Sequence, residues 1–186
     1  MSTPAAVVIG ASAGALEALS AILPALPASF ALPIFIVVHL PHNRKSVLAD
    51  ILRAKCRIPV QEAEDKEIVI AGRIYIAPPD YHLLVETNYC LALSSDEPVR
   101  YSRPSIDVLF ESAADTYGPA LIAIVLTGAN PDGADGLRKI GEAGGTTIVQ
   151  NPAEALAPEM PRAALAACPA AQPLPLAGIA AFLLGV

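Results

Sequence analysis

Residues 10–14, Gly-Ala-Ser-Ala-Gly, are the segment of this sequence with the clearest potential for chemistry. They follow a short apolar run at 7–9 that is typical of a strand, and from Leu16 onward apolar residues recur at helical spacing. A G-x-S-x-G pattern between a strand and a helix is the signature of a nucleophile elbow, which would present Ser12 to a substrate. The same turn would equally suit an anion, because the free N–H groups at a helix N-terminus attract negative charge. A third interpretation is structural, with Ser12 capping the helix.

Two further polar residues, His39 and Asp132, also follow apolar runs. His39 comes directly after residues 34–38, and Asp132 lies in the loop after residues 120–126. Both runs predict buried parallel strands, and sites in open α/β sheets lie at the carboxyl ends of the strands. A serine hydroxyl needs a base to remove its proton, and the base needs a third group to orient it. We therefore predict that Ser12, His39 and Asp132 form the catalytic triad of a serine hydrolase.

Simpler roles compete with this prediction at each position. Asp132 would also suit as the cap of the helix that follows it, and His39 as a hydrogen-bonded histidine at the sheet edge. His82 is a weaker candidate for the base, His42 is expected on a loop surface, and Asp135 on a solvated helix face. The chain order Ser–His–Asp also argues against the ordinary α/β-hydrolase fold, in which the acid precedes the histidine.

Composition and spacing exclude several classes of partner. The net charge of −6 provides no basic surface for nucleic acid. The three cysteines and three histidines lack metal-ligand spacing, and the turn at 10–15 departs from the G-x-G-x-x-G of a dinucleotide site, so we expect neither metal nor cofactor. Two uncharged stretches, 18–38 and 163–186, are interrupted by prolines, so we expect no membrane insertion. Because the N-terminus shows no signal-peptide pattern, we expect a cytoplasmic protein.

The predicted elements alternate between strands and helices over most of the chain. This alternation favours a doubly wound, mostly parallel α/β sheet with helices on both faces. Residues 61–100 differ, because closely spaced apolar runs separated by turn residues favour an insertion of antiparallel strands or hairpins. We expect main strands at 7–9, 34–38, 120–126 and 146–149, short strands at 59–60, 68–70, 73–77, 83–86 and 90–94, and helices after residue 14, around 47–52, over 103–113, around 137–140, and at 158–167 and 176–184.

The motifs at the predicted strand ends belong to a longer series. The series comprises residues 9–14 (Ile-Gly-Ala-Ser-Ala-Gly), 39–41 (His-Leu-Pro), 103–110 (Arg-Pro-Ser-Ile-Asp-Val-Leu-Phe), 126–136 (Leu-Thr-Gly to Asp-Gly-Ala-Asp-Gly), 144–146 (Gly-Gly-Thr) and 160–163 (Met-Pro-Arg-Ala). In this order and spacing it resembles the catalytic domain of the bacterial chemotaxis receptor methylesterase, CheB. The resemblance covers nearly the whole chain. It implies one catalytic domain over residues 1–186, with no N-terminal receiver domain, and the triad Ser12, His39 and Asp132.

The activity that the resemblance implies is that of a protein-glutamate methylesterase, often combined with protein-glutamine deamidase activity. His39 would take the proton of Ser12 as this serine attacks the γ-carbonyl of a glutamyl methyl ester, and Asp132 would orient His39. Backbone amides at the elbow, at Ala13, and in the loop at Ala129 and Asn130 would stabilise the oxyanion. The implied partners are methylated, chemoreceptor-like helical proteins and a separate receiver or signalling protein acting in trans.

This chain departs from the usual pattern of the family in several places. Ala15 stands where the family has a second glycine, and Glu159 where it has glycine before Met-Pro. The loop before the acid usually reads Thr-Gly-Met-Gly, but here Ala129 and Asn130 replace its last two residues. The altered loop keeps a second hypothesis open, a catalytically weak signalling module of the same fold that binds receptors. A third hypothesis is an esterase for a small-molecule ester.

Overall fold

The computed structural model describes residue 3 and residues 5–39 and 47–186. Across these residues the apolar runs form a seven-stranded sheet in the order β3-β4-β2-β1-β7-β8-β9, in which every neighbouring pair is parallel. The predicted parallel α/β architecture is therefore confirmed. The strands of this sheet are β1 (Ala6–Ala11), β2 (Ile34–Val38), β3 (Val60–Glu62), β4 (Ile74–Ile76), β7 (Leu121–Val125), β8 (Thr146–Gln150) and β9 (Gln172–Leu174).

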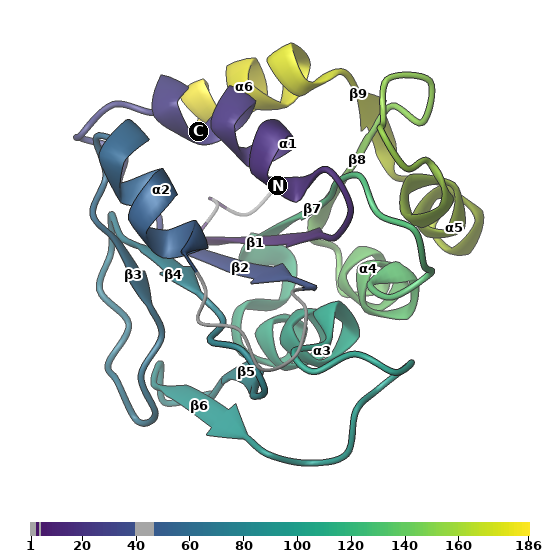
Figure 1. Cartoon of the computed structure of the whole chain (residues 1–186). Coiled ribbons are helices and arrows are strands. Elements are labelled where there is room, and N and C mark those ends of the chain that lie inside the picture. The colour runs from purple at the N-terminus through teal and green to yellow at the C-terminus, as the bar shows by residue number, and fades with distance from the viewer. Residues whose placement is uncertain (1–2, 4, 40–46) are drawn as a thin grey trace.

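Helices cover both faces of the sheet (Figure 1). Successive strand residues point to opposite faces, so Val7 and Ile9 join the core beneath α1, α2 and α6, whereas Val8 joins the core against α3, α4 and α5. None of the helices in the described residues is long and apolar enough to cross a membrane. The helices are α1 (Ala15–Ile22), α2 (Leu48–Lys55), α3 (Ile106–Tyr117), α4 (Ala134–Glu142), α5 (Glu159–Ala167) and α6 (Leu176–Leu184), with single 3₁₀ turns at Leu23–Ala25 and Gly118–Ala120.

Strand β1 lies between β2 and β7, where the order of strands along the sheet changes direction. Its backbone pairing continues past the strand ends. The N–H of His39 donates to the carbonyl of Ala11 (3.2 Å), and the N–H of Ser12 donates to the carbonyl of Thr127 (2.9 Å). The residues that follow β1, β2 and β7 are therefore held at one edge of the sheet, at the switch point where α/β proteins place their sites.

The first turn of α3 packs directly against the end of β1, because two glycines leave room for Ile106. A Cβ atom at Gly10 would lie 2.3 Å from Cγ2 of Ile106, and one at Gly133 would lie 2.6 Å from the same atom. Gly133 also has a φ of 95°, a backbone conformation that L side chains rarely adopt. This close approach brings the N-terminus of α3 to the loop after β7, where Asp132 lies.

The prediction of antiparallel strands over residues 61–100 is only partly right. β5 (His82–Val85) and β6 (Leu91–Ser94) form an antiparallel hairpin, apart from the main sheet. The strand predicted at 73–77 is β4, which pairs in parallel with β2 and β3, because the loop at 63–73 is long enough to return the chain to the same end of the sheet. Residues 68–70 form no strand; Ile68 makes only an isolated bridge with Cys90.

The sequence patterns do not predict β9, which pairs with β8 at one edge of the sheet. The strand is short and contains Pro173, which has no N–H to donate. Proline is tolerated on an edge strand, because one side of such a strand has no neighbour to bond. The same proline makes the segment look like a loop in the sequence.

Candidate active site

Ser12 is the first residue after β1 and lies on the turn that leads into α1. The turn is closed by a hydrogen bond from the N–H of Ala15 to the carbonyl of Ser12 (2.9 Å). Helix α1 is preceded by Gly14, whose φ is 84°, and no side chain caps the helix. The alternative role of Ser12 as a helix cap is therefore wrong. Its side chain is partly exposed and lines a groove beside α1.

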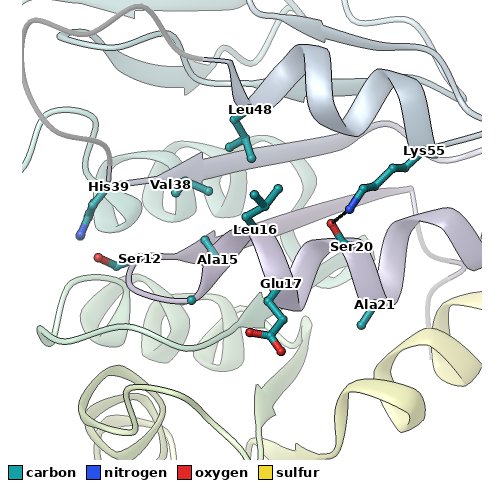
Figure 2. A pocket seen from close by; sticks show the side chains of 11 residues that line it. Ser12, Ala15, Leu16, Glu17, Ser20, Ala21, Val38, His39, Leu48 and Lys55 are labelled. Carbon is teal, nitrogen blue, oxygen red and sulfur yellow. Dashed lines mark hydrogen bonds between the residues drawn. The ribbon is translucent and has the colours of Figure 1, made fainter.

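His39 is the first residue after β2 and faces the same end of this groove (Figure 2). Its Nε2 lies 2.7 Å from Oδ2 of Asp132, and its side chain is 12% exposed. In the described residues no hydrogen bond joins Ser12 Oγ to the ring, but the two side chains lie on the adjacent ends of paired strands. Catalytic serine–histidine contacts are often loose before substrate binds. The structure thus brings together the three residues that strand-end reasoning selected.

The carboxylate of Asp132 is fully buried and accepts four hydrogen bonds. Oδ2 accepts from His39 and from the N–H of Ile106 (2.6 Å), while Oδ1 accepts from the hydroxyl of Ser105 (2.8 Å) and the N–H of Asp107 (3.1 Å). Burial acts to raise the pKa of Asp132, but the hydrogen bonds from His39 and from the two N–H groups outweigh it and hold that pKa below its ordinary value. Asp132 is therefore ionised at neutral pH.

Asp132 does not cap α4, the helix that follows it, so this alternative is also wrong. Helix α4 has Gly133 at its N-cap and no side-chain cap. Asp132 instead accepts hydrogen bonds from the first two N–H groups of α3. This helix comes before Asp132 in the chain and is separated from it by β7. The positive end of the α3 dipole thus faces the carboxylate and stabilises its charged form. One side chain both anchors α3 and holds the histidine.

A second serine and a second histidine, Ser105 and His82, also lie close to Asp132. The hydroxyl of Ser105 donates to Asp132, and the N–H of Ser105 donates to Nδ1 of His82 (3.1 Å). Nε2 of His82 lies 3.1 Å from the carbonyl of Glu97. Ser105 is 0% exposed and His82 is 2% exposed. The Ser105 hydroxyl donates to the carboxylate of Asp132, and the ring of His82 is bonded to the N–H of Ser105 and not to its hydroxyl. This arrangement resembles a triad in its residue types, but its burial and bonding suit it to holding α3 in place.

Asp107 places a second buried carboxyl beside Asp132. Its Oδ1 accepts from the N–H of Gly136 (2.8 Å), and its Oδ2 lies 3.4 Å from Nε of Arg100. Burial raises the pKa of Asp107 to about 6; the Gly136 N–H opposes this shift and the nearby charge of Asp132 adds to it. Asp135 pairs with the same arginine at the surface, which agrees with the predicted solvated position on a helix face.

Replacing Asp107 by asparagine is expected to change how the free energy of unfolding depends on pH. Since the pKa of Asp107 is about 6 in the folded protein and 3.8 in a model compound, the folded protein holds the proton more tightly than the unfolded chain. The stability that this provides is fully present below the lower value and is lost as the pH rises through the higher one. Relative to wild type, D107N should therefore gain about 1–3 kcal/mol as the pH rises from about 4 to about 7. Urea unfolding at both pH values measures this gain, and a difference independent of pH would contradict it.

The groove beside Ser12 and His39 runs between α1 and α2 and has a volume of about 790 Å³. Its walls are mainly apolar near the serine, and Lys55 and Ser20 are joined at its far end by a hydrogen bond of 3.0 Å (Figure 2). Such dimensions are in the range of ligand sites. The described residues that line it are Ser12, Gly14, Ala15, Leu16, Glu17, Ser20, Ala21, Val38, His39, Leu48 and Lys55.

The three residues predicted for the oxyanion and the substrate loop are Ala13, on the turn after β1, and Ala129 and Asn130, in the loop after β7. The carbonyl of Ala13 accepts from the hydroxyl of Thr127 (2.8 Å), which ties the elbow to the loop after β7. Within the described residues, the N–H groups of Ala13 and Ala129 make no hydrogen bond with another backbone group. Asn130 was predicted as part of this loop, and its side chain reaches His39: Nδ2 of Asn130 lies 3.2 Å from Nδ1 of the ring.

Sequence reasoning missed the contacts made by Ser105, Asp107 and Asn130. Ser105 and Asp107 lie at the start of α3, where polar residues interrupt an otherwise apolar segment. That interruption is the sequence feature that indicates a role for these two side chains. His42, predicted on a loop surface, lies outside the described residues. Within the described part of the chain, no group of three or more His, Cys, Asp or Glu residues is arranged to hold a metal ion.

Comparison with known proteins identifies the family. Residues 7–183 match the sequence pattern of the family described as "CheB methylesterase". A Leptospira interrogans protein named "Putative protein-glutamate methylesterase/protein-glutamine glutaminase" is 49% identical over 162 residues, 87% of this chain and 84% of that protein. "Protein-glutamate methylesterase/protein-glutamine glutaminase 3" of Burkholderia lata is 42% identical over 180 residues, 95% of this chain but 49% of the relative. The crystal structure of the Thermotoga maritima CheB methylesterase catalytic domain superposes with a TM-score of 0.93 at 34% identity over 99% of both chains. The chain therefore belongs to the CheB methylesterase family.

Proposed function

We propose that this chain is a protein-glutamate methylesterase in which Ser12 is the nucleophile, His39 the base and Asp132 the residue that orients the base. The observation that carries the proposal is the 2.7 Å contact between His39 Nε2 and Asp132 Oδ2, beside Ser12 at the carboxyl ends of neighbouring strands. The activity agrees with the printed names of the relatives, which also include protein-glutamine glutaminase. The second activity requires the same attack on the γ-carbonyl of a glutamine side chain, with ammonia as the leaving group.

The contacts of His39 assign the proton transfers of the proposed reaction. Because Nε2 is bound to Asp132, the nitrogen left to receive the proton of Ser12 is Nδ1. As Ser12 Oγ bonds to the γ-carbon of the ester, its proton passes to Nδ1 and the ester carbonyl becomes an oxyanion. The imidazolium that forms lies against the ionised Asp132, which stabilises its charge. Nδ1 then returns the proton to the departing methoxide, and a water molecule activated by the same nitrogen releases the glutamate.

The oxyanion requires donors near the elbow. The N–H groups of Ala13 and Ala129 support this role, because each adjoins the triad and neither is bonded to another backbone group among the described residues. Backbone N–H groups held by a strand-to-helix turn are already oriented before the charge develops, so little reorganisation is needed in the transition state. Loss of one such donor in other enzymes costs roughly 10²–10³-fold in kcat.

The substrates that we propose are methylated, helical chemoreceptor proteins in the cytoplasm, with a receiver or signalling protein acting in trans. The groove between α1 and α2 supports a protein substrate, because Ser12 lines it and is partly exposed among the described residues. Its apolar wall near Leu16 would accept the methyl ester and the aliphatic part of a glutamyl side chain. Family membership supports the choice of receptor.

One observation favours a second candidate function, a module that binds receptors with little turnover. The side-chain Nδ2 of Asn130 lies 3.2 Å from Nδ1 of His39, the nitrogen that must accept the proton of Ser12. A permanent donor at this position would oppose catalysis. The two candidates differ in whether the bound receptor is demethylated.

Methanol release from methylated chemoreceptors tests the proposed function. Membranes that contain receptors carrying a labelled methyl ester are incubated with purified protein, and volatile label is counted. Wild type should release methanol at a steady rate, and protein boiled beforehand should release none. Binding to the receptor without release of methanol would support the second candidate, whereas hydrolysis of small aryl esters alone would point to a small-molecule esterase.

A further inference from the structure

Asn130 contacts both of the residues that the proposed mechanism places behind the nucleophile. Its Oδ1 accepts a hydrogen bond from the N–H of Asp132 (3.1 Å), and its Nδ2 lies 3.2 Å from Nδ1 of His39. The other ring nitrogen, Nε2, is already bound to Oδ2 of Asp132 (2.7 Å). The imidazole is thus held through both of its nitrogens, from one loop.

These contacts determine which atoms carry hydrogen. The N–H of Asp132 can only donate, so the amide atom that faces it must be the oxygen of Asn130, and the NH₂ group must face His39. An NH₂ group can only donate, so Nδ1 of His39 must accept and carries no proton. The ring proton therefore lies on Nε2, where it is donated to the buried carboxylate.

We propose that Asn130 is a positioning residue of this esterase, whose amide selects the neutral tautomer of His39 with an unprotonated Nδ1. The catalytic part of this inference rests on the proposed function, in which Nδ1 receives the proton of Ser12. A glycine at this position would have no side chain with which to make the contact. The arrangement therefore depends on the side chain of residue 130 and not on the three proposed triad residues alone.

The proposed step shows what the amide must do during a reaction. When the Oγ–H bond of Ser12 breaks, the proton moves to Nδ1 of His39 and the electron pair of that bond stays on Oγ. Oγ then uses an electron pair to form its bond to the ester carbon. Nδ1 then carries a hydrogen, and the NH₂ of Asn130 can no longer donate to it. Asn130 hence stabilises the neutral ring relative to the charged one, and its amide must turn away as the acyl-enzyme forms.

The charges around the ring come from few elements in the described residues. Asp132 is the charged side chain bonded to His39, from the loop after β7. Glu17 of α1 and Lys55 of α2 line the same groove, and Lys55 is held by Ser20. Asp107 of α3, whose pKa is about 6, lies beside Asp132. Asn130→Asp keeps an oxygen for the N–H of Asp132, and the protonation of the ring nitrogens, read together with the pH profile, reports on the contact between Asn130 and the ring.

Two substitutions test the inference. Asn130→Asp keeps the shape of the side chain and an oxygen for the N–H of Asp132, but presents an acceptor to Nδ1, so the ring should be trapped with both nitrogens protonated between two carboxylates. Asn130→Ala removes the donor and supplies no acceptor. For N130D, kcat/KM at pH near 6.5 should fall at least about tenfold, and the pH of half-maximal kcat/KM should rise by about one unit or more. For N130A the same midpoint should rise by less.

Nitrogen-15 NMR of the His39 ring tests the inference independently of activity, because it shows directly which ring nitrogen carries a proton. In wild type at neutral pH, His39 should show a protonated Nε2 and an unprotonated Nδ1, and in N130D it should show two protonated nitrogens. If the wild-type tautomer carries its proton on Nδ1, or if both variants titrate as wild type does, the inference is overturned even if methanol release is confirmed. If the tautomers are as expected and no methanol is released, the proposed function fails while the role of Asn130 stands. If N130D does not fold, the spectrum and pH profile of N130A decide.

Discussion

Replacing Ser12 by alanine is expected to lower kcat for hydrolysis of the methyl ester by at least about 10⁴-fold, with little change in folding. The hydroxyl supplies the bond to the γ-carbon, and no other group at the end of β1 can replace it. Because Ser12 is partly exposed and caps no helix, its loss should leave the free energy of unfolding nearly unchanged. Methanol release under single-turnover conditions measures the rate, and urea unfolding measures the stability.

Ser105 provides the matched control for this substitution. It is fully buried, and its hydroxyl donates to Asp132. S105A should therefore lose about 1–3 kcal/mol of stability, because a buried carboxylate loses a donor, yet it should retain kcat within about tenfold of wild type. The opposite pattern, with S105A inactive and S12A active, would mean that the buried serine is the nucleophile and would overturn the proposed site.

Replacing Asp132 by asparagine is expected to reduce both kcat and stability. An amide can accept with only one of its two groups. If its NH₂ takes the place of Oδ2, it faces His39 and the N–H of Ile106; if it takes the place of Oδ1, it faces the Ser105 hydroxyl and the N–H of Asp107. An NH₂ group that faces His39 would donate to Nε2 and stabilise the tautomer with its proton on Nδ1, which could not accept the proton of Ser12. We expect a cost of about 10³–10⁴-fold in kcat. In either orientation one buried N–H group of α3, that of Ile106 or that of Asp107, loses its acceptor, at a cost of about 1–3 kcal/mol.

Asp135 serves as the control for the loss of charge. It lies three residues further along, is 48% exposed and pairs with Arg100 at the surface. D135N removes the same charge but should leave kcat within about twofold and stability within about 1 kcal/mol of wild type, since surface ion pairs contribute little. Equal losses of activity in D132N and D135N would show that overall charge, and not the contact with His39, controls the rate.

The central strands, and the places of the three proposed triad residues at their ends, could be predicted from the sequence, because both depend on local patterns. Continuous apolar runs mark buried parallel strands, and parallel strands bring their carboxyl ends to one edge, so Ser12, His39 and Asp132 follow from strand ends alone. The pairing of β4, which lies between β3 and β2, could not be assigned in the same way. β4 is only three residues long, and nothing in its sequence distinguishes a parallel neighbour from an antiparallel one.

The supporting contacts of the site could not be predicted, because they join segments that are distant in the chain. Asp132 has the residue type of a cap for the next helix, and only the packing of Ile106 against two glycines shows that it caps α3 instead. Similarly, Asn130 was singled out as a departure from the family's loop, but its contact with His39 depends on how β2 and β7 lie relative to each other. Tertiary geometry determined these roles.

Covalent labelling with a fluorophosphonate tests the central claim most directly, because the reagent reacts far faster with a serine whose proton is removed by a neighbouring base than with an ordinary hydroxyl. Wild-type protein is labelled, digested and analysed by mass spectrometry, with H39A and S105A treated in parallel. The label should appear on Ser12 in wild type and S105A and should be reduced at least about 100-fold in H39A. A label on Ser105, or a label on Ser12 that is independent of His39, would contradict the proposed triad.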